Sequence, residues 1–393
     1  MLFTPHKTPA LFWCARAACM PLLCKTHCKR NRKMSENHQQ AWPDVPVFDG
    51  HNDVLCRLWQ HHRPDAVNAF LQGTPSGQLD FPRLRRGNMA GGLFAAWAPG
   101  QASLDAADAQ AVARSAPHLL SLETIAAARD ATFAMLALLL RIEQASQEQI
   151  KICRSVRDIR DCMSRGRLAV VMHIEGAEAL DVDGELLDIL HASGLRSLGP
   201  LWSRPNQFGE GVPFRFPSSP DIGNGLTDAG KQLVRDCNRR RILVDLSHMD
   251  EKGFWHTAAI SDAPLVASHS NAHAISAQSR NLTDRQLAAI AETRGFVGVN
   301  FAVPFLREDG RRDAPTSLTE IVRHIEYLLD KVGEDGVGFG SDLDGATMPD
   351  DFGDVAGFPR LVAALAARGY SAELLHKICY GNWLRVLEAT WGE

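Results

Sequence analysis

Short apolar segments alternate with longer helical stretches from residue 45 to the end of the chain. Near-continuous apolar strands that alternate with helices are typical of a parallel sheet covered by helices on both faces. Eight such segments favour a closed (β/α)8 barrel, the TIM barrel, over an open doubly wound sheet. The expected strands are residues 45–49, 89–97, 168–174, 195–201, 242–246, 265–268, 296–301 and 336–341.

Apolar residues at helical spacing mark the segments between these strands. Thr227 is expected to cap one helix, because its hydroxyl can accept a hydrogen bond from a backbone N–H of the first turn. The sequence has neither a G-x-G-x-x-G turn after a strand nor a G-x-x-x-x-G-K-[ST] loop, so the phosphate cradles of nucleotide-binding folds are missing. The expected helical regions are residues 104–115, 119–148, 227–240, 282–292, 318–332, 357–368 and 372–390.

Charge is distributed unevenly along the chain. Residues 1–33 contain seven basic residues and no acidic residue, and the remainder carries 35 basic against 46 acidic residues. We expect residues 1–33 to be a basic, disordered extension and residues 34–393 to be a single barrel domain. An acidic body does not attract phosphate backbones, so nucleic-acid binding is not expected.

The nine cysteines do not suggest a disulfide framework. Four of them precede residue 29, and the other five are scattered through the body, where we expect small buried side chains. An odd, widely spread set in a large chain is typical of reduced thiols in a cytoplasmic protein. The apolar stretch 11–24 is interrupted by Arg16 and Pro21, which fits neither a secretory signal nor a membrane span. A cytoplasmic protein without membrane association is therefore expected.

Residues of the types that bind metals stand at the ends of the expected strands. In a (β/α)8 barrel the chemistry takes place at the C-terminal ends of the strands. Imidazole nitrogens and carboxylate oxygens are the ligands of zinc-type sites, and this number of groups suits two ions that share a bridging carboxylate. The segments concerned are 49–53 (DGHND), 173–176 (HIEG), 247–248 (SH), 268–270 (SHS) and 341–344 (SDLD).

Longer motifs resemble the membrane (renal) dipeptidase family, peptidase family M19. The resemblance begins near residue 45, follows the family's order and implies a (β/α)8 barrel that hydrolyses dipeptides with two zinc ions. It makes L-Xaa-D-Xaa dipeptides candidate substrates, and a homodimer is expected because members of the family are often dimers. The motifs are VFDGHNDVLCRL, HIEGAEAL, GLTDAGKQLVRDCNRRRILVDLSH, PLVASHSNAHAISAQSRNLTD and VGFGSDLDG.

The resemblance assigns five residues to the metal ions. His51 and Asp53 match the ligands of the first zinc, and His248 and His269 match those of the second. Glu175 matches the carboxylate that bridges both ions, which also gives it a part in catalysis.

The resemblance also implies the course of the reaction. A hydroxide shared by the two ions would attack the peptide carbonyl. Asp342 matches the acid/base aspartate that would pass a proton to the leaving amine, with nearby Asp344 as the alternative. Arg280 matches the arginine that pairs with the substrate carboxylate.

One position departs from the family pattern. Many members carry a histidine after the fourth strand that stabilises the oxyanion, and Trp202 occupies the corresponding position here. Stabilisation of the oxyanion would then have to come from a zinc ion or from another donor that contacts the substrate, and Arg204 and Asn206 in the same loop are the candidate donors.

Two other functions remain open. One is a different binuclear amidohydrolase that acts on lactones, carbamates or other amides. Such enzymes often bridge their metals with a carboxylated lysine at a strand end, and no lysine stands there in this sequence. The other is a catalytically silent barrel that binds metals, which the presence of both Asp342 and Arg280 argues against.

Overall fold

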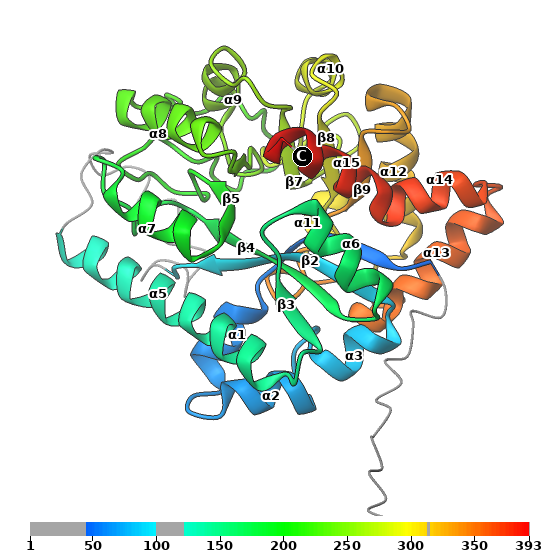
Figure 1. Cartoon of the computed structure of the whole chain (residues 1–393). Coiled ribbons are helices and arrows are strands. Elements are labelled where there is room, and N and C mark those ends of the chain that lie inside the picture. Colours follow the sequence, from blue (N-terminus) through cyan, green and yellow to red (C-terminus); the bar gives the residue numbers. More distant parts are fainter. Residues whose placement is uncertain (1–44, 100–121, 313–314, 393) are drawn as a thin grey trace, which may run out of the picture. The chain divides into compact units, whose positions relative to one another are not determined.

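A computed structural model describes residues 45–99, 122–312 and 315–392. The predicted extension 1–33 and the predicted helix 104–115 lie outside these ranges. All strand pairs between neighbours are parallel, and helices surround the strands (Figure 1). The strands are β1 (Val47–Asn52), β2 (Met89–Trp97), β3 (Ile150–Ile152), β4 (Leu168–Glu175), β5 (Leu195–Gly199), β6 (Leu243–Val244), β7 (Val266–Ser270), β8 (Phe296–Val299) and β9 (Val337–Phe339).

Eight of these strands form the barrel, in the order β6-β5-β4-β2-β1-β9-β8-β7. A parallel bridge between Asp245 and Val266 joins the two ends of this order, so the sheet closes on itself. The predicted (β/α)8 barrel is therefore confirmed, and each predicted strand has an observed counterpart. The strand β3 was not predicted, and it pairs with the first half of β4 outside the barrel order.

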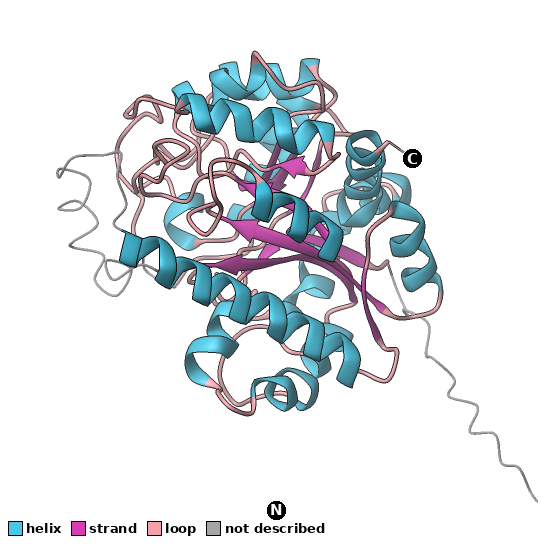
Figure 2. Cartoon of the chain, turned by 60° about the vertical axis from the view of Figure 1, so that its left-hand side comes forward, coloured by secondary structure: helices cyan, strands magenta, loops and turns pink. Residues whose placement is uncertain are grey.

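The helices lie outside the strands, as Figure 2 shows from a second direction. Thr227 caps α8 as predicted, since its side chain accepts a hydrogen bond from the Gly230 N–H at 3.1 Å. The predicted C-terminal helix is interrupted by a π-helix, η3. The described helices are α1 (Val54–His61), α2 (Ala66–Gln72), α3 (Phe81–Arg86), α5 (Leu122–Ala145), α6 (Val156–Ser164), α7 (Glu185–Ser193), α8 (Asp228–Arg239), α9 (Glu251–Ala258), α10 (Asp284–Glu292), α11 (Val303–Leu306), α12 (Thr319–Val332), η2 (Val355–Gly357), α13 (Phe358–Ala367), α14 (Ala372–His376), η3 (Lys377–Gly381) and α15 (Asn382–Trp391).

Trp383 of α15 packs against the barrel strands. Its side chain is fully buried, and its indole N–H donates to the Phe339 carbonyl at 2.8 Å. The rings of Phe48 and Phe296 lie 6.1 and 4.1 Å from the Trp383 ring. Gly50 of β1 makes this approach possible, because a Cβ atom there would collide with the indole.

We expect Trp383→Ala to lower the free energy of unfolding by about 3–5 kcal/mol, because it leaves a large cavity and an unpaired carbonyl. Denaturant titration with matched m-values measures the change. Trp255→Ala on α9 is the control and should cost clearly less, since Trp255 is only partly buried. Equal losses in the two variants would contradict this view of the core.

The cysteine prediction is confirmed for the five cysteines that the structure describes, all of which are buried and free: Cys56, Cys153, Cys162, Cys237 and Cys379.

Among the described residues, no helix combines the length and the apolar character needed to cross a membrane.

Candidate active site

Three histidines from separate parts of the barrel surround the carboxylate of Glu175. The Glu175 Oε1 atom lies 2.8 Å from His248 Nε2, 3.3 Å from His269 Nε2 and 3.6 Å from His51 Nε2. His51 belongs to β1, Glu175 ends β4, His269 lies in β7, and His248 follows β6. The C-terminal ends of the strands thus bring four of the predicted ligands to one point.

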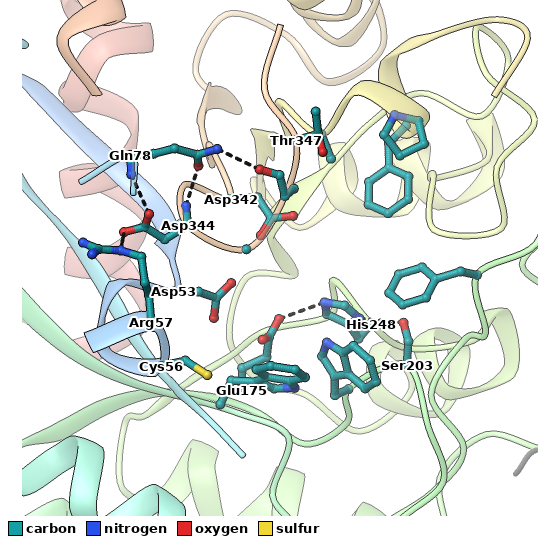
Figure 3. Close-up of a pocket in the computed structure, with 18 of the residues that line it drawn as sticks. Asp53, Cys56, Arg57, Gln78, Glu175, Ser203, His248, Asp342, Asp344 and Thr347 are labelled. Atoms are coloured by element: carbon teal, nitrogen blue, oxygen red, sulfur yellow. Dashed lines mark hydrogen bonds and ion pairs between the residues drawn. The ribbon is translucent and has the colours of Figure 1, made fainter. Parts of the chain in front are cut away.

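Two further carboxylates lie beside this group. Asp53 precedes α1, and its Oδ2 lies 3.5 Å from His51 Nε2. One atom each of His51, Asp53 and Asp342 could hold an ion, because these atoms lie within 4.8 Å of one another. Figure 3 shows Asp53 between Glu175, which pairs with His248, and the Asp342 loop.

Hydrogen bonds fix the orientation of two imidazoles. The Nδ1 of His248 is 2.8 Å from Ser203 Oγ, and the Nδ1 of His269 is 2.8 Å from Ser268 Oγ. Ser268 Oγ donates to Asp245 Oδ2 at 2.5 Å, so it accepts from the Nδ1–H of His269. The Nε2 lone pair of His269 therefore faces Glu175, and a second group that fixes the tautomer in this way is common behind metal ligands.

The buried donors fit divalent metal ions. The two Nε2 atoms of His248 and His269 lie 3.0 Å apart, and burial lowers the pKa of both imidazoles well below the usual value. Two neutral imidazole nitrogens at this distance can act together as ligands of one cation. Both ring nitrogens of His51 and one oxygen of Asp53 are buried without a hydrogen-bond partner. Neutral imidazoles and carboxylates are the ligand types that zinc prefers.

The carboxylates concentrate negative charge in this buried site. Burial raises the pKa of Glu175 well above its usual value, against the opposing effect of His51. Burial also raises the pKa of Asp342. Burial would lower the pKa of His51, but Glu175, Asp53 and Asp342 together raise it to about 10. The cluster therefore favours positive charge, which divalent ions would supply.

Asp342 and Asp344 have different surroundings, although both adopt positive φ angles of 64° and 66°. Asp342 lies in the cluster and accepts a hydrogen bond from Asn300 Nδ2 at 2.9 Å. Asp344 points to Arg57, whose Nε lies 2.9 Å away, and accepts from the Gln78 backbone N–H at 2.6 Å (Figure 3). Of the two aspartates, only Asp342 belongs to a potential metal-binding group among the described residues.

Arg280 is buried next to the histidine cluster. Its Nη2 lies 3.3 Å from His248 Nε2 and donates to the His269 carbonyl at 3.2 Å, and its Nη1 donates to the Ser247 carbonyl. Burial lowers its pKa to about 10, so the guanidinium remains charged at neutral pH. The residue is 3% exposed and does not line the pocket that opens onto the cluster.

Arg204 and Asn206 stabilise the loop after β5. The Nε of Arg204 donates to Glu178 Oε1 at 2.8 Å, and its Nη2 donates to the Ala98 carbonyl. Asn206 donates to the Pro200 carbonyl at 2.9 Å and accepts from the Phe208 N–H at 2.8 Å. Neither side chain lines the pocket.

Trp202 lines that pocket instead. The cavity has a volume of about 870 Å³ and reaches Asp53, Glu175, His248 and Asp342. The Trp202 ring is stacked on His248, with centroids 5.9 Å apart and an interplanar angle of 30°. A cavity of this size suits a small-molecule ligand.

Several supporting residues of the site were not among the predicted ones. Asp245 is the next-to-last residue of the predicted strand 242–246 and accepts hydrogen bonds from Ser247 and Ser268, so its place near a strand end was an available signal. Asn300 similarly lies within a predicted strand segment. Ser203 lies in an irregular loop, where no sequence pattern indicates its contact with His248.

The fold and the site define a metallohydrolase built on a (β/α)8 barrel. The family model for membrane dipeptidase, peptidase family M19, matches residues 36–391, and the chain belongs to this family of metallo-dipeptidases.

Solved and curated relatives agree with this assignment. A metallo peptidase from Rhodobacter sphaeroides, solved with a phosphinate mimic of the dipeptide L-Ala-D-Ala, is 49% identical, with a TM-score of 0.83 over 88% of this chain and 99% of that one. The chain is 29% identical to dipeptidase ataJ of Aspergillus terreus over 89% of this chain and 86% of the relative. It is 51% identical to an uncharacterised protein in the pqqA 5′ region of Klebsiella pneumoniae, over 67% of this chain and 97% of the relative.

Proposed function

We propose that the protein is a dipeptidase that uses two zinc ions, with L-Xaa-D-Xaa dipeptides among its substrates. The observation that carries the proposal is the position of Glu175 Oε1 within 3.6 Å of three imidazole nitrogens. His51 and Asp53 would hold one ion, His248 and His269 the other, and Glu175 both. The L-Ala-D-Ala mimic bound by the 49% identical relative supports this substrate class.

The residues of the chain would have separate roles in catalysis. When bound, the ions polarise the peptide carbonyl and activate a water molecule at neutral pH. Asp342 takes a proton from the attacking water and delivers it to the leaving amine, a role that its position in the cluster supports. Asn300 holds the Asp342 carboxylate in place through the bond at 2.9 Å.

Substrate orientation would depend on charge. The buried cation of Arg280 beside His248 attracts the C-terminal carboxylate of the dipeptide. A free carboxylate would then be required close to the scissile bond, which favours dipeptides over longer chains. Arg204 and Asn206 contribute indirectly, because their hydrogen bonds fix the loop that carries Trp202.

Metal stripping and reloading tests the proposal. The full-length protein is treated with a chelator and reloaded with zinc, and zinc per chain is compared with amine release from a dipeptide panel that includes L-Ala-D-Ala. We expect two zinc ions per chain, loss of hydrolysis on stripping and its return on reloading. Protein that binds two ions and releases amine from no dipeptide would contradict the proposal and point to another amidohydrolase substrate.

We also propose that residues 34–393 act as one catalytic domain and that the protein forms a homodimer. The match of the family model to residues 36–391 supports the first point. Light scattering of the purified protein tests the second.

A further inference from the structure

Four aromatic side chains form a continuous wall along the pocket: Trp97, Trp202, Phe214 and Phe305. The ring centroids of Trp97 and Trp202 are 5.0 Å apart, and those of Trp202 and Phe214 are 5.6 Å apart. Phe214 is in turn stacked on Phe305 at 5.9 Å with an interplanar angle of 18°. We call these four residues the aromatic wall.

The aromatic wall adjoins the metal-ligand cluster directly. Trp202 and Phe214 contact His248, with centroids 5.9 and 6.3 Å from the imidazole. Trp97 is the strand partner of Glu175 in the pairing of β2 with β4. A substrate whose peptide bond lies at the cluster therefore has these rings within reach of its side chains.

Polar residues and smaller apolar residues line the rest of the pocket, and the apolar ones are Cys56, Pro213, Ala302, Pro304 and Ala346. Arg57 and Gln78 both bond to Asp344 and form a polar group on the pocket lining (Figure 3). The pocket thus offers a substrate one aromatic region beside His248 and a polar group at Arg57, Gln78 and Asp344.

The central part of the wall is held rigidly from behind. The Arg204 guanidinium lies 5.2 Å from the Trp202 ring centroid and is fixed by Glu178. The Trp202 carbonyl accepts from the Arg204 N–H at 2.7 Å, and a Cβ atom at Gly211 would collide with that carbonyl. A surface fixed in this way can contribute binding energy without an ordering cost.

We propose that the aromatic wall selects dipeptides with an apolar side chain on the residue bound over His248. This inference rests on the proposed dipeptidase function and adds its specificity. A larger apolar side chain gains affinity by leaving water, with about a 10–200-fold effect per methylene in a fitted hydrophobic pocket. A charged side chain at the same place would lose hydration without gaining a partner.

The test compares the kcat/KM values of zinc-loaded wild type and zinc-loaded Trp202→Ala. The substrates are dipeptides that carry alanine, leucine or aspartate at one position, and each of the two positions is varied in turn. At one of the two positions, wild type should prefer leucine over alanine by at least about tenfold. In Trp202→Ala this ratio should fall at least about fivefold, mainly through KM, while zinc content stays at the wild-type level. The ratio is internal to each variant, so a general loss of activity does not alter it.

Two further variants make the test decisive. Phe214→Ala, also in the wall, should lower the same ratio, whereas Trp255→Ala, whose ring packs on Phe254 away from the pocket, should leave it unchanged. A wild type that cleaves dipeptides without preferring leucine at either position overturns the inference and leaves the dipeptidase function intact. Unchanged ratios in both wall variants overturn it as well, and a wild type that cleaves no dipeptide overturns both proposals.

Discussion

Asp342→Asn should lower kcat by about 10²–10⁴-fold, the usual contribution of a positioned acid/base group. The amide has nearly the same shape as the carboxylate and can still accept the hydrogen bond from Asn300, but it cannot carry a proton between water and amine. KM and zinc content should change little. Steady-state kinetics and elemental analysis on the same preparation measure all three quantities, and full turnover by the zinc-replete variant would contradict the assigned role.

Asp344→Asn is the matched comparison, because it makes the same change two residues further along. It removes a negative charge from a buried pair with Arg57, so it should destabilise the fold by about 3–5 kcal/mol. The kcat of the folded fraction should fall far less than in Asp342→Asn. The opposite pattern, with Asp344→Asn abolishing turnover and Asp342→Asn only destabilising the fold, would make Asp344 the acid/base residue.

Glu175→Gln should reduce metal affinity by more than about 100-fold, the upper end of the loss measured for residues that merely support a ligand. The amide removes the negative charge at the centre of three imidazole nitrogens and can place an N–H against them. Zinc per chain after dialysis against a competing chelator measures the effect, and activity should fall in parallel.

Glu178→Gln is the control for this experiment. Glu178 is also buried and stands three residues away, but it pairs with Arg204 and not with the histidines. Its variant should retain wild-type zinc content. Equal zinc content in Glu175→Gln and wild type would exclude Glu175 as a bridging ligand.

Local patterns predicted much of the fold. The strands of the barrel are buried on both faces, so several of them appear in the sequence as nearly unbroken apolar runs, and β4 (LAVVMHIE) is the clearest example. The short strand β3 escaped detection because its sequence, IKI, lasts only three residues and alternates like many surface segments. The π-helix η3 inside the predicted C-terminal helix has no distinct periodicity that could reveal it.

The candidate site was predictable where ligand types stand directly at strand ends. His51, Glu175 and His269 lie within or at the end of a strand, and the barrel topology then forces them to one face. The loop after β5 followed no such rule. The side chains of Arg204 and Asn206 carry polar groups suited to a substrate, yet both are engaged in hydrogen bonds that shape the loop.

The sequence by itself determined the barrel, the strand ends and the identity of the residues that gather there. Local apolar patterns show which segments are buried strands and in what order these strands follow one another along the chain. Only the tertiary structure distinguished Asp342 from Asp344, since the difference lies in partners remote in the chain, Asn300 and Arg57. Only the tertiary structure shows why residue 345 is a glycine, because a Cβ atom there would collide with the carboxylates of Asp53 and Asp342. The contacts with Asn300, Arg57 and Asp53 join segments far apart in the chain, and their geometry follows from packing rather than from any local pattern.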